Sequence, residues 1–118
     1  MISCATNFDW PLYQLDVKNA FLHGDLKEEV YMEIPPGLNT AETEGKVLRL
    51  RKSLYGLKQS PRAWFDRFKR AMLAMGYKQC NGDHTLFYLY SKNHISILAV
   101  NMLAILLSLE MILWRWYH

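Results

Sequence analysis

One segment constrains the fold more than any other, because residues 60–76 carry the start, the face and the end of an amphipathic helix. Ser60 and Pro61 open it, since serine is a favoured N-cap residue and proline is tolerated at the first helical position. Gly76 ends it as a C′ residue. The apolar residues recur three and four apart and form one stripe: Trp64, Phe65, Phe68, Ala71, Met72 and Met75.

Short runs on both sides of this helix predict strands. Three precede it, at residues 11–17, 30–34 and 47–51, and two follow it, at 86–90 and 94–100. We expect the second and third to pair antiparallel across a polar loop, and the last two to form a hairpin. The resulting order βββαββ predicts an α+β fold.

Length limits the kinds of protein that the sequence can encode. A chain of 118 residues, 51% of them hydrophobic, is globular in composition and allows one small domain at most. Any motif of a large polymerase, kinase or dehydrogenase would therefore make this chain one piece of it. Cys4 and Cys80 have no metal-ligand spacing, and residues 1–8 hold no apolar run of signal-peptide length. These features predict an intracellular location, in the cytoplasm or nucleus, without a zinc site.

Positive charge is concentrated in the middle of the chain. Residues 46–70 hold nine Lys or Arg and a single carboxylate, whereas residues 1–45 hold two Lys and eight carboxylates. A basic stretch can neutralise phosphates, but a solvated helix face beside an edge strand has the same composition. Weak, non-specific nucleic-acid binding is therefore one hypothesis.

The last part of the chain is strongly apolar. Between residues 95 and 114 only Ser96, Asn101, Ser108 and Glu110 are polar, so the segment is long enough to span a bilayer. Asn101 and Glu110 weigh against insertion, and so does a strand that runs without a turn into a membrane helix. A small membrane-anchored protein is the weakest of the hypotheses.

Two stretches resemble the reverse transcriptase of copia-type long-terminal-repeat retrotransposons. They are Trp-Pro-Leu-Tyr-Gln-Leu-Asp-Val-Lys-Asn-Ala-Phe-Leu-His-Gly at 10–24 and Ser-Leu-Tyr-Gly-Leu-Lys-Gln-Ser-Pro-Arg-Ala-Trp-Phe at 53–65. The resemblance covers about residues 8–100. It implies part of a right-hand polymerase palm, in which carboxylates on neighbouring strands hold two Mg²⁺ ions. In the parent family the partners are an RNA template, a DNA primer and deoxynucleoside triphosphates.

The resemblance assigns metal and nucleotide roles to two residues near the N-terminus. Asp16 matches the first metal-binding, catalytic aspartate, since two-metal nucleotidyl transfer needs fixed carboxylate ligands. The alternative is a strand-edge carboxylate paired with Lys18 or Lys58. Phe21 matches an aromatic residue that excludes a ribose 2′-hydroxyl, a role that is compatible with a core position.

Further matches lie at the start of the helix. The segment containing Tyr55, Gly56, Lys58 and Gln59 resembles the one beside the incoming nucleotide and template base, although a turn before a capped helix has the same pattern. Candidate nucleic-acid contacts on the helix, unless its face is simply solvated, are Arg62, Arg67, Lys69 and Arg70. Asp83 also matches the family, but Thr85 two residues later favours a turn-capping role.

The sequence departs from the family where the other metal ligands belong. The family has Tyr-Val-Asp-Asp after the hairpin strand, whereas here Val100 is followed by Asn101-Met-Leu-Ala, and no carboxylate lies between Asp83 and Glu110. One carboxylate cannot hold two magnesium ions. The sequence therefore predicts a catalytically inactive chain.

The genetic code offers an origin for the apolar tail. The codons of residues 101–112, read from the third base of the Asn101 codon, permit Tyr-Val-Gly-Asp-Ile-Val-Ile-Thr-Gly-Asn-Asp, which resembles the missing turn and the strand after it. We therefore expect a partial palm domain at 8–100 and an out-of-frame, helix-prone tail at 101–118, from a decayed element. A non-catalytic nucleic-acid-binding remnant is the main alternative.

Overall fold

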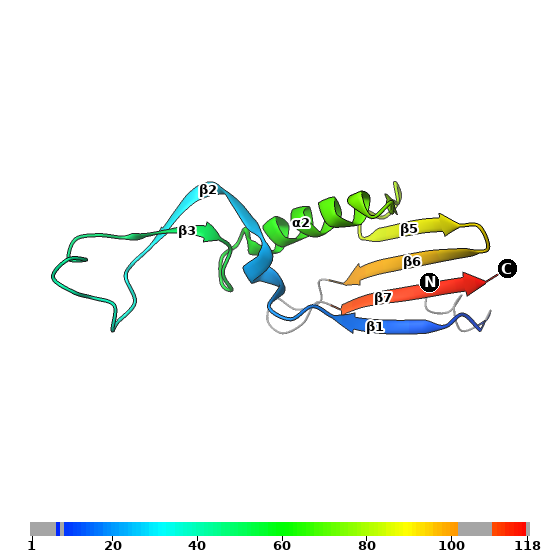
Figure 1. Ribbon diagram of the computed structural model, residues 1–118, viewed down its shortest axis with the longest axis horizontal. Coiled ribbons are helices and arrows are strands. Elements are labelled where there is room, and N and C mark those ends of the chain that lie inside the picture. Colours follow the sequence, from blue (N-terminus) through cyan, green and yellow to red (C-terminus); the bar gives the residue numbers. More distant parts are fainter. Residues whose placement is uncertain (1–6, 8, 102–109, 118) are drawn as a thin grey trace. The chain divides into compact units, whose positions relative to one another are not determined.

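The structure is a computed structural model that describes residues 7, 9–101 and 110–117, the last group for its backbone only. It divides into two compact units, one formed by Met1–Ala20 and Phe68–His118 and the other by Phe21–Arg67. Each unit contains its own antiparallel sheet (Figure 1). One helix and two small sheets make an α+β structure, as the sequence predicts.

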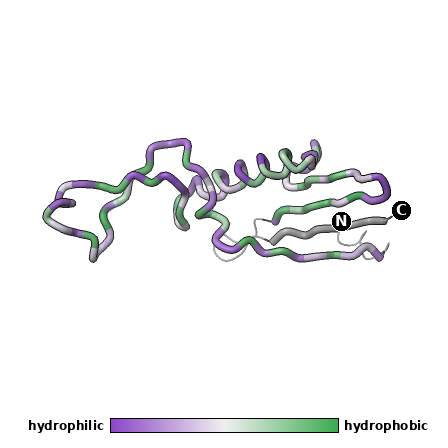
Figure 2. Tube along the Cα trace, in the orientation of Figure 1, coloured by the Kyte–Doolittle hydropathy of each residue, from purple (hydrophilic) through white to green (hydrophobic). Residues whose placement is uncertain are grey.

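The first unit is built on a five-stranded sheet with the order β1-β7-β6-β5-β4, in which every pairing is antiparallel. Its strands are β1 (Leu12–Asp16), β4 (Lys78–Gln79), β5 (Leu86–Ser91), β6 (His94–Asn101) and β7 (Glu110–Tyr117). Strands β5 and β6 form the predicted hairpin, with Leu86 opposite Ala99 and Ser91 opposite His94. Figure 2 shows the mostly hydrophobic hairpin strands and the hydrophilic turn that joins them.

Buried aromatic and aliphatic side chains form the core of this unit. Phe68, from helix α2 (Ser60–Ala74), meets Phe87 of β5 edge to face, with ring centroids 5.5 Å apart. Phe87 is fully buried and lies opposite the buried Leu98 of β6. An aromatic pair of this geometry contributes about 0.5–1.5 kcal/mol beyond the burial of its surface.

The end of α2 follows the prediction and its start does not. Gly76 has a φ of +90°, and the amides of Gly76 and Tyr77 donate to the carbonyls of Leu73 and Met72, which is a Schellman motif. At the start, the amide of Ala63 donates to the carbonyl of Gln59, and Ser60 is already the first residue of α2. Gln59 therefore holds the N-cap position predicted for Ser60, whose hydroxyl donates to the Leu54 carbonyl.

The predicted apolar stripe of α2 is only partly buried. Trp64 and Phe68 are buried, whereas Ala71 is exposed and Met75 is 63% exposed. Burial therefore belongs to the middle of the helix, and the prediction is wrong for its last turn. Periodicity identifies the face of a helix but not how far along it the covering surface extends.

The second unit holds strands β2 (Asp25–Met32) and β3 (Leu48–Lys52). They pair antiparallel, as predicted, with Val30 opposite Leu50 and an irregularity between Asp25 and Val30. Strand β2 starts five residues before the predicted strand at 30–34. A 3-10 helix, η1 (Ala20–His23), precedes it and has no counterpart among the predicted elements.

The tail differs from the predicted helix where the structure describes it. Residues 110–117 form strand β7, which pairs with β6 on one side and with β1 on the other. Two neighbouring strands satisfy its backbone groups, and its tryptophans and tyrosine favour a strand. Residues 102–109 lie outside the described residues. None of the helices among the described residues has the length and hydrophobicity needed to cross a membrane.

Candidate metal and nucleotide site

Asp16 is the last residue of β1 and is exposed. The strand register places it opposite Glu110 of β7, which in turn lies opposite Asn101 of β6. Residues directly opposite one another in antiparallel strands share a face of the sheet, so these three positions form a row across three strands. Among the described residues, no ion pair joins Asp16 to Lys18.

The described residues of this row do not fit a pair of magnesium ions. By sequence the row holds two acidic residues, Asp16 and Glu110, and one uncharged amide, Asn101, which is one carboxylate fewer than the three aspartates of the family. Within the described part of the chain, no three His, Cys, Asp or Glu side chains lie close enough together to hold a metal ion. Two Mg²⁺ ions that coordinate a substrate need several carboxylate oxygens as ligands to offset their charge. The position of Glu110 opposite Asp16 was not predicted, because the strand pairing of the tail does not follow from the motifs.

Two of the predicted nucleotide residues lie together in the second unit. The rings of Phe21 and Tyr55 have centroids 5.0 Å apart and planes tilted by 47°. Phe21 lies in η1 and is half-buried, while Tyr55 is 50% exposed in the turn before α2. Gly56 follows with a φ of +92°, a conformation that L side chains rarely adopt. Two residues that are 34 positions apart in the chain thus form one partly exposed aromatic pair.

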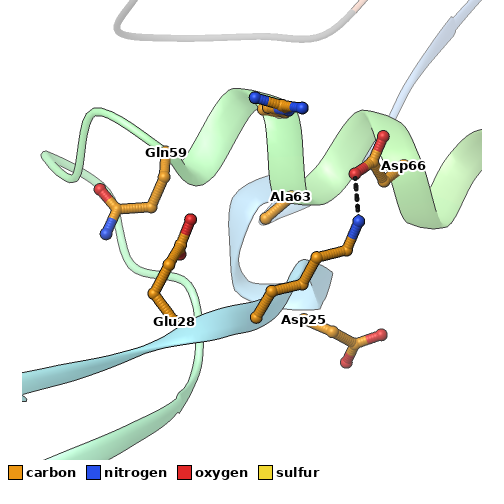
Figure 3. A pocket seen from close by; sticks show the side chains of 7 residues that line it. Asp25, Glu28, Gln59, Ala63 and Asp66 are labelled. Carbon is orange, nitrogen blue, oxygen red and sulfur yellow. Dashed lines mark hydrogen bonds and ion pairs between the residues drawn. The ribbon is translucent and has the colours of Figure 1, made fainter.

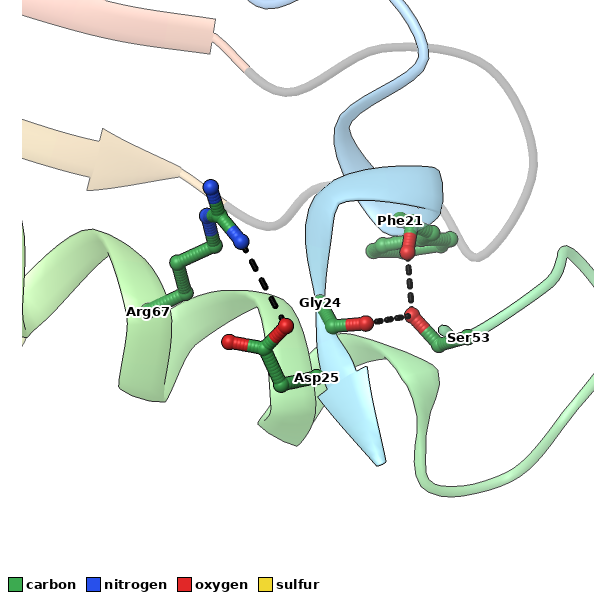
Figure 4. A network of polar contacts seen from close by, with 5 residues as sticks. All are labelled: Phe21, Gly24, Asp25, Ser53 and Arg67. Atoms are coloured by element: carbon green, nitrogen blue, oxygen red, sulfur yellow. Dashed lines mark hydrogen bonds and ion pairs between the residues drawn. The ribbon is translucent and has the colours of Figure 1, made fainter. Parts of the chain in front are cut away.

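Two fully buried serines hold the turns that carry these rings, and Figure 4 shows one of them, Ser53, with Phe21 and Gly24. The hydroxyl of Ser53 donates to the Phe21 carbonyl and lies 3.4 Å from the Gly24 carbonyl, which also accepts the Ser53 amide at 2.9 Å. The hydroxyl of Ser60 donates to the Leu54 carbonyl. This role of Ser53 was not predicted, because its only signal in the sequence is a small polar residue directly after a strand.

Gly24 lies against the start of α2. An added Cβ would stand 2.7 Å from the Ser53 hydroxyl, 2.8 Å from the Trp64 amide nitrogen and 3.0 Å from the Ala63 carbonyl carbon. Only a residue without a side chain fits there. The backbone of η1 and β2 can therefore approach the helix closely enough for Ser53 to bond both carbonyls.

Gln59 lines a small polar hollow between β2 and the start of α2, with a volume of about 140 Å³ (Figure 3). An ion pair crosses it, since the ammonium of Lys27 lies 3.2 Å from a carboxylate oxygen of Asp66. The remaining lining residues are Asp25, Glu28, Arg62 and Ala63. Lys58 is exposed in the preceding turn. Three carboxylates in one hollow make it a poor site for a phosphate.

Two arginines of the basic region, which is defined as residues 46–70, form ion pairs with carboxylates. Arg67 lies 3.4 Å from Asp25, and Arg49 lies 3.1 Å from Glu29. These pairs are largely exposed and contribute about 0–1 kcal/mol each. Of the other predicted nucleic-acid contacts on α2, Arg62 and Arg70 are exposed and Lys69 is half-buried.

The turn-capping role predicted for Asp83 is confirmed. One oxygen of its carboxylate accepts the Thr85 hydroxyl at 2.6 Å and the Thr85 amide at 2.9 Å. The bond from the Thr85 hydroxyl, followed by the bond from its amide, lowers the pKa of Asp83. Asp83 therefore stabilises the turn that leads into β5.

Comparisons with known proteins identify the family. The family described as reverse transcriptase (RNA-dependent DNA polymerase) matches residues 1–112. The chain belongs to this reverse transcriptase family. The resemblance to copia-type retrotransposon polymerases is thus confirmed, and the family match extends beyond Val100 into the tail.

Three curated Pol polyproteins are similar to this reverse transcriptase segment. The retrovirus-related Pol polyprotein from transposon TNT 1-94 of Nicotiana tabacum is 44% identical over 83% of the chain. Those from transposons RE2 and RE1 of Arabidopsis thaliana are 41% and 40% identical over 92% of it. The aligned regions are only 8%, 7% and 7% of these relatives' lengths. No solved structure matches the chain.

Proposed function

We propose that this reverse transcriptase segment keeps the nucleotide-facing turn of its family but does not itself synthesise DNA. The observation that carries the proposal is the row of Asp16, Glu110 and Asn101, in which an amide stands on β6 at the start of the segment where the family has two aspartates. In the parent family, divalent ions, an RNA template, a DNA primer and deoxynucleoside triphosphates take part in synthesis.

The chemistry of the family explains why Asp16 alone is insufficient. Two metal ions, when bound, stabilise the attacking and leaving oxygens of the transferred nucleotide. The protein must hold both ions with carboxylates at fixed separation. Asp16 and Glu110 give the row two acidic residues, but Asn101 is an uncharged amide, so the row lacks the third carboxylate of the family. The ring pair of Phe21 and Tyr55 would still offer an apolar wall to the sugar of a deoxynucleotide.

A polymerase assay tests the proposal. The full chain is incubated with a primed RNA template, deoxynucleoside triphosphates and Mg²⁺, and incorporation is compared with that of an Asp16→Asn variant. We expect equal, background incorporation from both. Synthesis by the original chain that the Asp16→Asn variant lacks would overturn the proposal.

The basic region supports a second function, the binding of nucleic acid without chemistry. Exposed Arg62 and Lys58 lie near one another in the sequence, ahead of further cations on α2. Since four or five cations could reach phosphates together, we expect weak, non-specific binding with a log–log salt slope of roughly −3 to −4.5. Fluorescence anisotropy of a labelled oligonucleotide, titrated at several NaCl concentrations, measures this slope. A slope near zero, or a strong sequence preference, contradicts this function.

A further inference from the structure

The two buried serines of the second unit do more than fill space. Ser53 and Ser60 are both 0% exposed, and each donates its hydroxyl proton to a backbone carbonyl, 32 residues away for Ser53 and six residues away for Ser60. Both acceptors adjoin the aromatic pair: one is the carbonyl of Phe21 itself, and the other is that of Leu54, directly before Tyr55. The two hydroxyls therefore hold the backbone on both sides of the ring contact.

Burial makes these bonds hard to replace. Water cannot reach these buried groups to replace a lost partner. A hydroxyl or carbonyl left without a partner there costs about 1–3 kcal/mol of folding free energy. The carbonyl of Phe21 fixes the peptide plane that follows its Cα, and the carbonyl of Leu54 fixes the plane that precedes the Cα of Tyr55. With one peptide plane beside each Cα held, the backbone of both aromatic residues has less freedom to move the rings apart.

Gly24 makes the first of these bonds possible. Its missing Cβ leaves the space in which the Ser53 hydroxyl stands, 2.7 Å from where that atom would be. The Gly24 carbonyl also accepts the Ser53 amide at 2.9 Å and lies 3.4 Å from the Ser53 hydroxyl. Ser53 directly follows β3 and Gly24 directly precedes β2, so these contacts tie the two strand ends together. Ser53 thus joins η1, β2 and β3 at one point.

We propose that Ser53 and Ser60 are positioning residues for the Phe21–Tyr55 pair and thereby for the sugar of a deoxynucleoside triphosphate. This inference rests on the nucleotide-facing part of the proposed function. Neither serine touches the nucleotide, because both are fully buried while Tyr55 is half exposed. They act by setting the distance and tilt of the two rings, which have centroids 5.0 Å apart at 47°.

Nuclear magnetic resonance of the full chain tests the positioning directly. Selective labelling of Phe and Tyr rings gives a cross-peak between Phe21 and Tyr55, assigned by its loss in Phe21→Leu and Tyr55→Leu variants. We expect Ser53→Ala and Ser60→Ala each to weaken this cross-peak strongly and to broaden the Tyr55 ring signals. Ser53→Cys and Ser60→Cys keep a weak donor of similar size and should recover part of the cross-peak. Ser91→Ala, at an exposed serine of β5, is the matched control and should leave it unchanged.

A titration with dTTP, in the presence of Mg²⁺, links the ring pair to the nucleotide. We expect the Tyr55 ring signals to shift with dTTP, and each alanine variant to bind about three- to tenfold more weakly, because a loosened ring must be ordered again on binding. 5-Methyl-UTP, which differs from dTTP only in its 2′-hydroxyl, should bind more weakly than dTTP to the original chain. This difference should shrink in both alanine variants, which a loss of stability alone would not cause.

The outcomes separate the inference from the proposed function. A full-strength cross-peak in both alanine variants, with the amide signals of β5 and β6 unchanged, overturns the positioning role. If the alanine variants do not fold, the cysteine variants decide the question, since an unchanged cross-peak and unchanged dTTP affinity in both also overturn it. If the cross-peak responds as expected but dTTP does not bind to the original chain, the nucleotide-facing part of the proposed function fails and the serines remain structural.

Discussion

At the scale of single residues, small side chains decide the geometry of the second unit. Gly24, Ser53 and Ser60 allow two turns to approach closely, and two aromatic rings come together as a result. A motif match identifies Phe21 and Tyr55, but the residues that hold them carry almost no signal in a single sequence. A buried serine and an exposed serine are the same letter in the sequence, and only the fold shows which of them is buried.

The close approach at Gly24 predicts a large effect of a small substitution. Gly24→Ala should lower the free energy of unfolding by about 1–3 kcal/mol, because the new Cβ would overlap the Ser53 hydroxyl and the α2 backbone. Urea denaturation followed by circular dichroism measures the change. Gly82→Ala is the control, since nothing lies within 4 Å of the corresponding Cβ there. Equal stability of the two variants would contradict the close packing at Gly24.

Asp83 predicts a pH-dependent contribution to stability. The two bonds from Thr85 lower its pKa in the folded state below the ordinary value of 3.8, so the ionised carboxylate favours folding. This contribution is fully present above the unfolded-state pKa and is lost as pH falls through the lower folded-state pKa. We expect Asp83→Asn to destabilise the chain at pH 6 and to have little effect at pH 2, as measured by urea unfolding at both values. A Glu44→Gln change in the exposed loop serves as the control, and a pH-independent effect of Asp83→Asn would rule this account out.

At the scale of elements, the amount that the sequence predicts depends on how local the cause of each element is. The Schellman motif at Gly76, the β5–β6 hairpin and the pairing of β2 with β3 follow from nearby turn chemistry and alternation, and all three are confirmed. The exposed last turn of α2 and the strand at 110–117 were not predicted, because both depend on distant surfaces. Periodicity cannot tell a buried strand from a helix in an apolar run.

The position of β1 at the edge of the sheet leads to a prediction about amide exchange. All of its pairings in the described sheet are with β7, from Leu12 opposite Trp114 to Asp16 opposite Glu110. Deleting residues 110–118 should therefore raise hydrogen exchange at the amides of β1 to nearly unprotected rates, while those of β5, which keeps β4 and β6 as neighbours, stay protected. Mass spectrometry of peptides from the intact and shortened chains measures both. Continued protection of β1 in the shortened chain would show that another partner holds it.

At the scale of the whole molecule, family membership follows from the motifs, whereas the candidate metal site depends on how the strands pair. The family match covers residues 1–112, yet the described part of the chain has no metal-binding cluster of three His, Cys, Asp or Glu side chains. The sequence could predict the family because its motifs are long and continuous. It could not predict which residues stand beside Asp16, because that depends on how the last segment pairs in the sheet.

The out-of-frame hypothesis for residues 101–118 predicts a specific feature of the gene. The locus should show a net loss of one base or gain of two bases shortly before codon 101, after which the shifted frame continues as polymerase-like sequence. Sequencing genomic DNA and transcript across this point tests it. Stop codons at once in the shifted frame would disprove the hypothesis, whereas a tyrosine, valine and aspartate in that order would support it.

The pairing of β1 with β7 also means that a change in the sequence of the tail alters the surroundings of the N-terminal strand. The strand that carries Asp16 belongs to the long family motif, and its sole neighbour in the described sheet comes from the segment that the out-of-frame hypothesis treats as altered. A mutation that changed the tail would have replaced the residues facing Asp16 without touching the motif itself. Loss of function in such a lineage could therefore begin with a new neighbour for an unchanged aspartate, and the aspartate would persist afterwards only as long as its strand was still useful to the sheet.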